Sequence, residues 1–213
     1  MKKFALVTIL TAISASAQAQ GVGLPDGTVD VYFQRLSRDG ILDGCSLVFT
    51  TLMRDTAYLK GEQIVLNGSI AIRNFKDSQL SFTGKLGTRR VSSPNMTWFA
   101  PANFYFSTPN GTTAGTAKII ESETPGYRLL IADAFHEKIM AVVTDIIKEA
   151  EFTVGFNRKV GGQDVYSVVK MNVALKQNRD GSAAMVTDSK TAYDFSDCMA
   201  KLTTDISQRL NKR

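Results

Sequence analysis

Apolar and polar residues alternate along two neighbouring stretches of this chain, 63–73 and 79–87. A two-residue period places successive side chains on opposite faces of a strand. One face of each stretch is apolar or carries glycine, and it consists of Ile64, Leu66, Gly68, Ile70 and Ile72, then Leu80, Phe82 and Leu86. The other face is polar, and only short turns at 60–62 and 74–78 separate these strands and a preceding strand at 46–58. The pattern therefore predicts an antiparallel meander with one solvated face.

More strands are predicted in the second half of the chain, where β-branched and aromatic residues recur between turn residues. The segment Pro109-Asn110-Gly111 is typical of a hairpin turn, and it joins predicted strands at 103–107 and 112–121. The remaining predicted strands are 127–131, 151–157, 165–176 and 183–187.

Two segments have helical periodicity. Apolar residues in 134–149 follow a spacing of three and four, and Asp133 stands where it can cap the first amides. In the C-terminal segment one helical face consists of Phe195, Cys198, Met199, Leu202, Ile206 and Leu210. We therefore predict an α+β fold, a mainly antiparallel β-sheet or sandwich of about eight strands with two amphipathic helices packed on one face.

The first nineteen residues are typical of an export signal. Lys2 and Lys3 precede a short apolar stretch, and Ala17-Gln18-Ala19 fits an A-x-A cleavage site. We expect residues 1–19 to be a signal peptide, 20–27 a flexible segment and 28–213 a single domain. An uncleaved anchor is the competing interpretation of the first segment.

Cys45 and Cys198 are the two cysteines of the chain, so only one intramolecular pairing exists. Together with the signal, they predict a disulfide formed in an oxidising compartment. The alternative is a pair of buried free thiols. No C-x-x-C pair is present, which disfavours a thiol oxidoreductase.

The formal charge of +5 does not indicate a nucleic-acid-binding protein, because two of the excess cations, Lys2 and Lys3, belong to the predicted signal. The remaining lysines and arginines are scattered, whereas binding along a phosphate backbone needs a stripe of cations. No apolar run after the signal is long enough for a membrane helix. The predicted location is periplasmic or secreted.

Sequence motifs assign no catalytic, cofactor-binding or metal-ligating residue. His136 is the single histidine, so a histidine-rich metal site has no support. Glu121 and Glu123 form the least improbable carboxylate pair for glycoside chemistry, but many acidic pairs have this spacing. Nucleophile-elbow and phosphate-loop motifs are absent from the sequence.

An aromatic cluster follows two arginines in the middle of the chain. It contains Trp98, Phe99, Phe104, Tyr105 and Phe106, and it lies beside Arg89 and Arg90. These rings either close one end of the core or form a binding surface on a long connection. On the second interpretation, the candidate contacts for a ligand or partner are Arg89, Arg90, Trp98, Phe99 and Tyr105.

These observations favour an exported, non-enzymatic binding or assembly protein of the bacterial periplasm or envelope. The expected partner is an envelope protein or a small apolar ligand. We expect this chain to have no cofactor. Two alternatives stay open: a hydrolase acting on cell-wall or extracellular polymer, and a structural subunit of a secretion or surface assembly. The sequence does not determine the oligomeric state.

Overall fold

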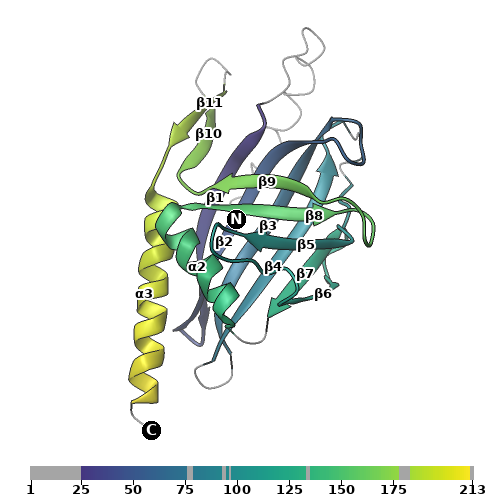
Figure 1. Cartoon of the computed structure of the whole chain (residues 1–213). Helices are drawn as coiled ribbons and strands as arrows, with labels where there is room; N and C mark the ends of the chain where they lie inside the picture. Colours follow the sequence, from purple (N-terminus) through teal and green to yellow (C-terminus); the bar gives the residue numbers. More distant parts are fainter. Residues whose placement is uncertain are drawn as a thin grey trace, which may run out of the picture.

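The computed structural model describes residues 25–75, 79–92, 95, 97–132, 135–177 and 183–211, and most of these residues lie in antiparallel strands (Figure 1). The predicted signal peptide, residues 20–24 of the predicted flexible segment and the predicted turn residues 76–78 and 178–181 lie outside the described residues. Within them the chain forms eleven strands and two helices, which confirms the predicted α+β class with a larger number of strands.

Six strands form one antiparallel sheet, which we call the large sheet. Its spatial order is β1-β2-β3-β4-β7-β6. The bounds are β1 Gly27–Arg38, β2 Ile41–Asp55, β3 Glu62–Phe75, β4 Gln79–Arg90, β7 Tyr127–Ala132 and β6 Lys118–Glu121. Strands β2, β3 and β4 pair in sequence order, which is the predicted meander.

Three further strands form the small sheet, which crosses one face of the large sheet (Figure 1). They are β5 Asn103–Ser107, β8 Glu151–Asn157 and β9 Val165–Lys170. A separate hairpin pairs β10 Val173–Gln177 with β11 Ala183–Thr187. The helices are α2 Glu137–Glu149 and α3 Lys190–Leu210, and both lie on the same side of the large sheet as the small sheet. We call this side of the large sheet its inner face and the opposite side its outer face.

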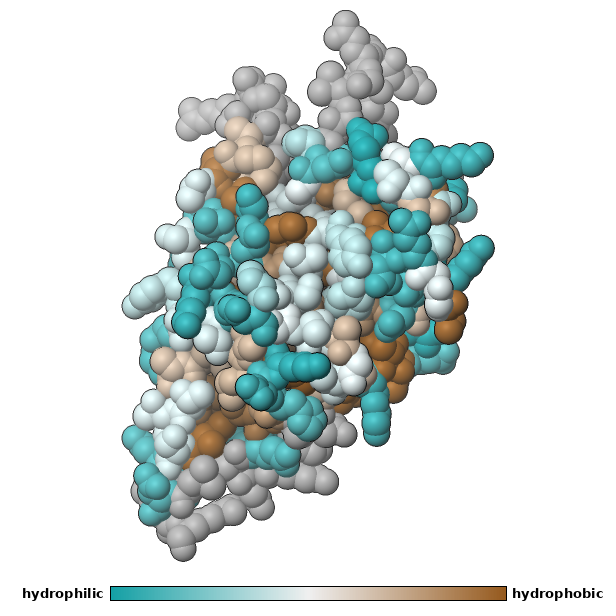
Figure 2. All heavy atoms as spheres, in the orientation of Figure 1, coloured by the Kyte–Doolittle hydropathy of each residue, from teal (hydrophilic) through white to brown (hydrophobic). Residues whose placement is uncertain are grey.

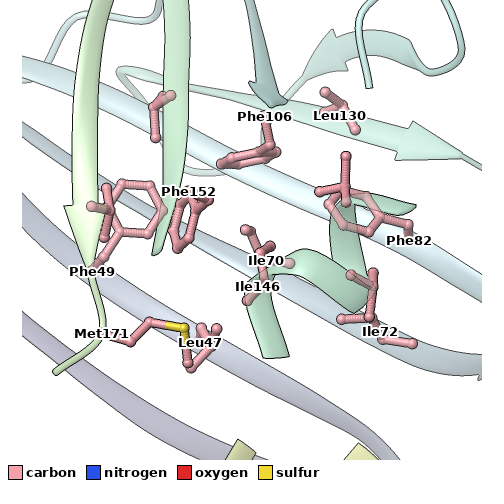
Figure 3. Close-up of a cluster of buried hydrophobic side chains, with 14 of the residues drawn as sticks. Leu47, Phe49, Ile70, Ile72, Phe82, Phe106, Leu130, Ile146, Phe152 and Met171 are labelled. Carbon is pink, nitrogen blue, oxygen red and sulfur yellow. The ribbon is translucent and has the colours of Figure 1, made fainter. Parts of the chain in front are cut away.

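The core lies between the two sheets and the helices. Phe106 of β5 contacts Phe49 of β2 and Phe152 of β8 edge to face, with ring centroids 6.3 and 5.9 Å apart, and these side chains point toward one another in Figure 3. The alternating residues Ile64, Leu66, Ile70, Ile72, Phe82 and Leu86 are all fully buried. The predicted apolar face of the meander is therefore confirmed as the inner face.

The cysteines join α3 to the large sheet. Cys45 of β2 and Cys198 of α3 form a disulfide, with Cα atoms 6.0 Å apart, and both side chains are fully buried. Phe195, Met199, Leu202 and Ile206 are buried on the same helical face, as predicted. The first turn is also attached, because Thr191 Oγ1 donates to the Val31 carbonyl at 3.1 Å.

Strand β1 is not predicted from the sequence. No strand is predicted before residue 46, but the structure has β1 there and begins β2 at Ile41, so Cys45 lies within a strand. As an edge strand, β1 is largely exposed and carries little apolar patterning. Its signal is the turn Asp39-Gly40, whose φ angles of 51° and 78° suit a two-residue hairpin.

The predicted hairpin at Asn110-Gly111 is largely wrong. After the turn, Ser107 and Thr112 form one isolated bridge, and the next strand begins only at Lys118. Strand β5 pairs instead with β8, and β6 pairs with β7. Gly111 supports a different contact, since a Cβ there would lie 2.5 Å from the Lys138 carbonyl oxygen of α2. The glycine lets this loop pack against the helix.

The predicted strand 165–176 is divided at Met171-Asn172 into β9 and β10. The Met171 amide donates to the Ala150 carbonyl at 2.7 Å, which extends the β8–β9 register by one residue, and the chain leaves the small sheet after it. Helix α2 also begins later than predicted, with His136 at its N-cap, and the predicted cap Asp133 lies outside the described residues. Within α2, Val142 is buried, and Met140, predicted on the buried stripe, is exposed.

Candidate functional site

The five aromatic residues predicted as one cluster occupy three different environments. Phe104 and Phe106 of β5 are buried in the core, so the core interpretation is correct for them. Tyr105 points to the opposite face of β5, away from the large sheet. Trp98 lies on the outer face of the large sheet, where it contacts Tyr127. The structure therefore does not bring Trp98 and Tyr105 into one site.

Two cations and two aromatic rings meet on the outer face of the large sheet, and we call Lys85, Arg89, Trp98 and Tyr127 the tryptophan cluster. The rings of Trp98 and Tyr127 are 5.3 Å apart with a tilt of 37°. The Arg89 guanidinium lies 5.2 Å from the centroid of Trp98, and the Lys85 ammonium 4.8 Å from that of Tyr127. Both pairs have the separation of cation–π contacts.

Two other predicted contact residues lie beside this cluster without joining its ring contacts. The Phe99 backbone forms a bridge with Thr88, and its ring is 45% exposed. The Arg90 side chain pairs with Glu62 at 3.5 Å. Because successive residues of β4 point to opposite faces, Arg89 and Arg90 diverge.

Hydrogen bonds hold Tyr127 and Lys85 in place. The Tyr127 hydroxyl donates to Asn67 Oδ1 at 3.0 Å, and Lys85 Nζ donates to Thr124 Oγ1 at 2.7 Å. Burial raises the pKa of Tyr127, and the nearby Arg89 charge opposes that rise. The phenol therefore stays protonated and remains a donor to Asn67 at neutral pH.

Tyr105 belongs to a second aromatic pair, on the exposed face of the small sheet. It stands opposite Gly155 in the register, and Gly155 stands opposite Tyr166, so the glycine leaves room for the two rings. Their hydroxyls are 3.3 Å apart, and the Tyr105 hydroxyl donates to Asp164 Oδ2 at 2.9 Å. Burial and these hydrogen bonds raise the pKa of Tyr105 strongly, so it acts here as a neutral donor.

Tyr166 also lines a hollow of about 490 Å³ between β9, the hairpin β10–β11 and the first strands of the large sheet. We call it the apolar hollow. Most of its lining is apolar, and the full lining consists of Asp26, Gly27, Thr28, Leu52, Met53, Tyr166, Ser167, Val168, Lys170, Val173 and Met185. In Figure 2 hydrophobic atoms gather over the hairpin β10–β11 at the upper left of this face.

The apolar hollow is not predictable from any one stretch of sequence, because its lining comes from five separate strands. One signal for it was present. Strand β9 buries Val165, Ser167 and Val169 on one face and exposes Tyr166 and Val168 on the other. A strand that is apolar on both faces has a second face in need of a partner.

A polar hollow of about 480 Å³ lies beside α2. Its central carboxylate, Asp145, is buried and accepts hydrogen bonds from the Asn110 amide and side chain at 3.1 to 3.2 Å. Hydrogen bonds from Thr108 and Asn110 lower the pKa of Asp145. Through these hydrogen bonds Asp145 holds the 108–111 loop against α2, so its role is structural.

The residues considered for enzymatic or metal chemistry stand apart from these hollows. His136 is an exposed helix cap, and Glu121 pairs with Arg128 at 3.3 Å. Among the described residues, no group of three histidine, cysteine, aspartate or glutamate side chains is placed to hold a metal ion. None of the helices in that part of the chain is long and apolar enough to cross a membrane.

Comparisons with models of protein families, with curated proteins and with solved structures find no match to this chain. We therefore infer function from the geometry of the apolar hollow and the tryptophan cluster.

Proposed function

We propose that the chain is an exported, non-enzymatic binding or assembly protein that holds an apolar group of its partner in the apolar hollow. One observation carries this proposal. Tyr166, Val168 and Met185 are 57%, 43% and 44% exposed around a hollow whose lining also includes the buried Leu52 and Met53. Apolar side chains that surround a concavity and stay in contact with water are typical of a binding surface.

The lining favours one apolar group with a polar attachment. Lys170 and Asp26 stand at the hollow with opposite charges, while Leu52, Met53 and Val173 supply apolar contact. Burial of apolar surface stabilises a complex by about 25 cal/mol per Å² before the cost of association is subtracted. An acyl chain or an apolar side chain of an envelope protein fits this distribution.

The hollow is built from strands, so it exists before a ligand arrives. Thr28 Oγ1 accepts from the Lys170 amide at 2.8 Å, and Thr51 and Ser167 hydroxyls are 3.3 Å apart, which ties β9 to the large sheet. A preformed site loses little conformational entropy on binding. Export is supported by the disulfide, since such bonds persist mainly in oxidising compartments.

Titration with the apolar dye 8-anilinonaphthalene-1-sulfonate tests the proposal. We expect Val168→Asp to weaken dye binding at least about tenfold, because a carboxylate in an apolar site loses hydration. Ile120→Asp is the matched control, since Ile120 of β6 is also 43% exposed and lies outside the hollow. Equal binding by both variants and the unaltered protein would exclude the hollow as the site.

A further inference from the structure

We infer that the outer face of the large sheet carries a second binding site, in which the tryptophan cluster and an adjoining small hollow bind an acidic sugar, a pyranose ring bearing a carboxylate. The lining of this site shares no residue with that of the apolar hollow, and the inference is independent of the function proposed above. Three observations support it: two cations without an anionic partner, the half-buried aromatic rings beside them, and a neighbouring hollow lined in part by Tyr127.

The two cations of the cluster lack an anionic partner. Within the described residues, neither Lys85 nor Arg89 lies within 4.0 Å of a carboxylate, although Arg54, Arg73, Arg90, Arg128 and Arg158 each do. Arg89 Nε is moreover buried and has no hydrogen-bond partner in that part of the chain. A half-buried guanidinium held against an indole without a counter-charge is stabilised when an anion binds.

Strand β4 places the cations on either side of an aromatic ring. Lys85, Gly87 and Arg89 point to the outer face, and the Tyr127 ring lies over Gly87, where a Cβ would come within 2.8 Å of it. Because Gly87 has no side chain, the Tyr127 ring can lie between the two cations. Trp98 then packs on Tyr127 and under Arg89.

A hollow of about 250 Å³ adjoins Lys85 and Tyr127. Its lining consists of Val48, Asn67, Gly68, Ser69, Lys85, Thr124 and Tyr127. Ser69 has no side-chain hydrogen bond within the described residues, and the Lys85 ammonium donates only one of its three protons, to Thr124. This volume is smaller than that of a drug-sized site, so it suits a ligand with a single ring.

An acidic sugar satisfies all three features. A pyranose presents C–H groups that pack against the part of Tyr127 that lines the hollow, hydroxyls that pair with serine and lysine, and a carboxylate for the Arg89 guanidinium. Single-stranded nucleic acid also combines stacking with charge, but it requires a groove of cations along several phosphates. Two cations beside one small hollow favour the sugar.

The chain contains a single tryptophan, so Trp98 fluorescence reports directly on this site. Titration of the full folded protein with hexagalacturonate should change Trp98 emission. The affinity for this sugar should fall when the salt concentration rises. Neutral maltohexaose should bind at least about tenfold more weakly, because it lacks the carboxylate. Equal responses to both sugars, no response to either, or tighter binding of a single-stranded DNA dodecamer would overturn the inference.

Variants separate binding from folding. We expect Arg89→Ala and Lys85→Ala each to weaken hexagalacturonate binding about tenfold or more while the circular dichroism spectrum is unchanged. Lys118→Ala is the control, because Lys118 is exposed on β6 of the same sheet and lines neither hollow. Val168→Asp should bind the sugar normally, which keeps this test separate from that of the apolar hollow. Unaltered sugar binding by both Arg89→Ala and Lys85→Ala would show that the cluster is structural only.

Discussion

At the scale of single residues, the core depends on glycines that let large rings approach a strand. A Cβ on Gly84 of β4 would lie 2.3 Å from Cε2 of Phe106, and one on Gly68 of β3 would lie 2.5 Å from Cζ of Phe49. These distances are far below normal contact. Gly84 therefore lets the small sheet approach the large sheet, whereas Gly68 makes room for the Phe49 ring from the neighbouring strand of the same sheet.

We predict that Gly84→Ala lowers the free energy of unfolding by about 1–3 kcal/mol, the usual cost of overpacking a core. This cost exceeds the gain of about 0.4–1 kcal/mol from a less flexible unfolded chain. Urea unfolding of a double-mutant cycle with Phe106→Leu measures the coupling. If Phe106→Leu does not relieve the penalty, Phe106 is not its cause.

The alternation of side chains along strands also explains why the candidate sites are only partly predictable from the sequence. Alternation along β5 puts Phe104 and Phe106 on one face and Tyr105 on the other, so proximity in sequence does not make them one cluster. The same alternation separates Arg89 from Arg90. The sequence identifies Arg89 and Trp98 as candidates, but Tyr127 and Lys85 join them only through strand pairing.

At the scale of elements, a buried ion pair connects the end of β2 to the turn after β8. Arg158 Nε lies 2.7 Å from Asp55 Oδ2, and the two side chains are 19% and 0% exposed. The Tyr58 amide also donates to Asp55, at 2.9 Å. Asp55 therefore joins the large sheet, the loop that follows it and the small sheet.

We predict that Arg158→Met lowers the free energy of unfolding by about 3 kcal/mol, because it leaves a buried carboxylate without its counter-charge. Arg54→Met provides a matched comparison, since Arg54 pairs with Asp26 while the two are 57% and 43% exposed. Its cost should stay below about 1 kcal/mol. Equal thermal or urea stabilities for the two variants would contradict a special role for the buried pair.

The elements that differ from prediction do so for identifiable reasons. Strand β1 has weak patterning because it is an edge, although Asp39-Gly40 marks its turn. The Asn110-Gly111 turn forms, yet β5 pairs with β8, whose Phe152 and Phe156 complete the core. Local turn chemistry favours a hairpin, but burial across the small sheet decides which strand β5 joins.

At the scale of the whole molecule, the disulfide links positions 153 residues apart. It attaches the last helix to the second strand, so it closes a loop that contains most of the described residues. In the chain-entropy model, a loop of this length stabilises the folded state by about 4–5 kcal/mol.

We predict that Cys45→Ala/Cys198→Ala lowers the free energy of unfolding by about 4 kcal/mol, measured by urea denaturation. Adding dithiothreitol should lower the stability of the unaltered protein by a similar amount. The double variant serves as the control, because the reductant should leave its midpoint unchanged. A reductant that has no effect on the unaltered protein under unfolding conditions would contradict the prediction.

Three features follow from the amino-acid sequence alone: the inner face of the meander, the buried face of α3 and the single cysteine pairing. The first two follow from the spacing of apolar residues, and the third from the count of cysteines. Three others depend on contacts in the folded chain: β5 pairs with β8, β9 ends at Lys170, and five strands surround the apolar hollow. Such contacts join segments that are distant in sequence. Which strands pair depends on the apolar surface that all these segments bury together, and no single stretch of sequence carries that information.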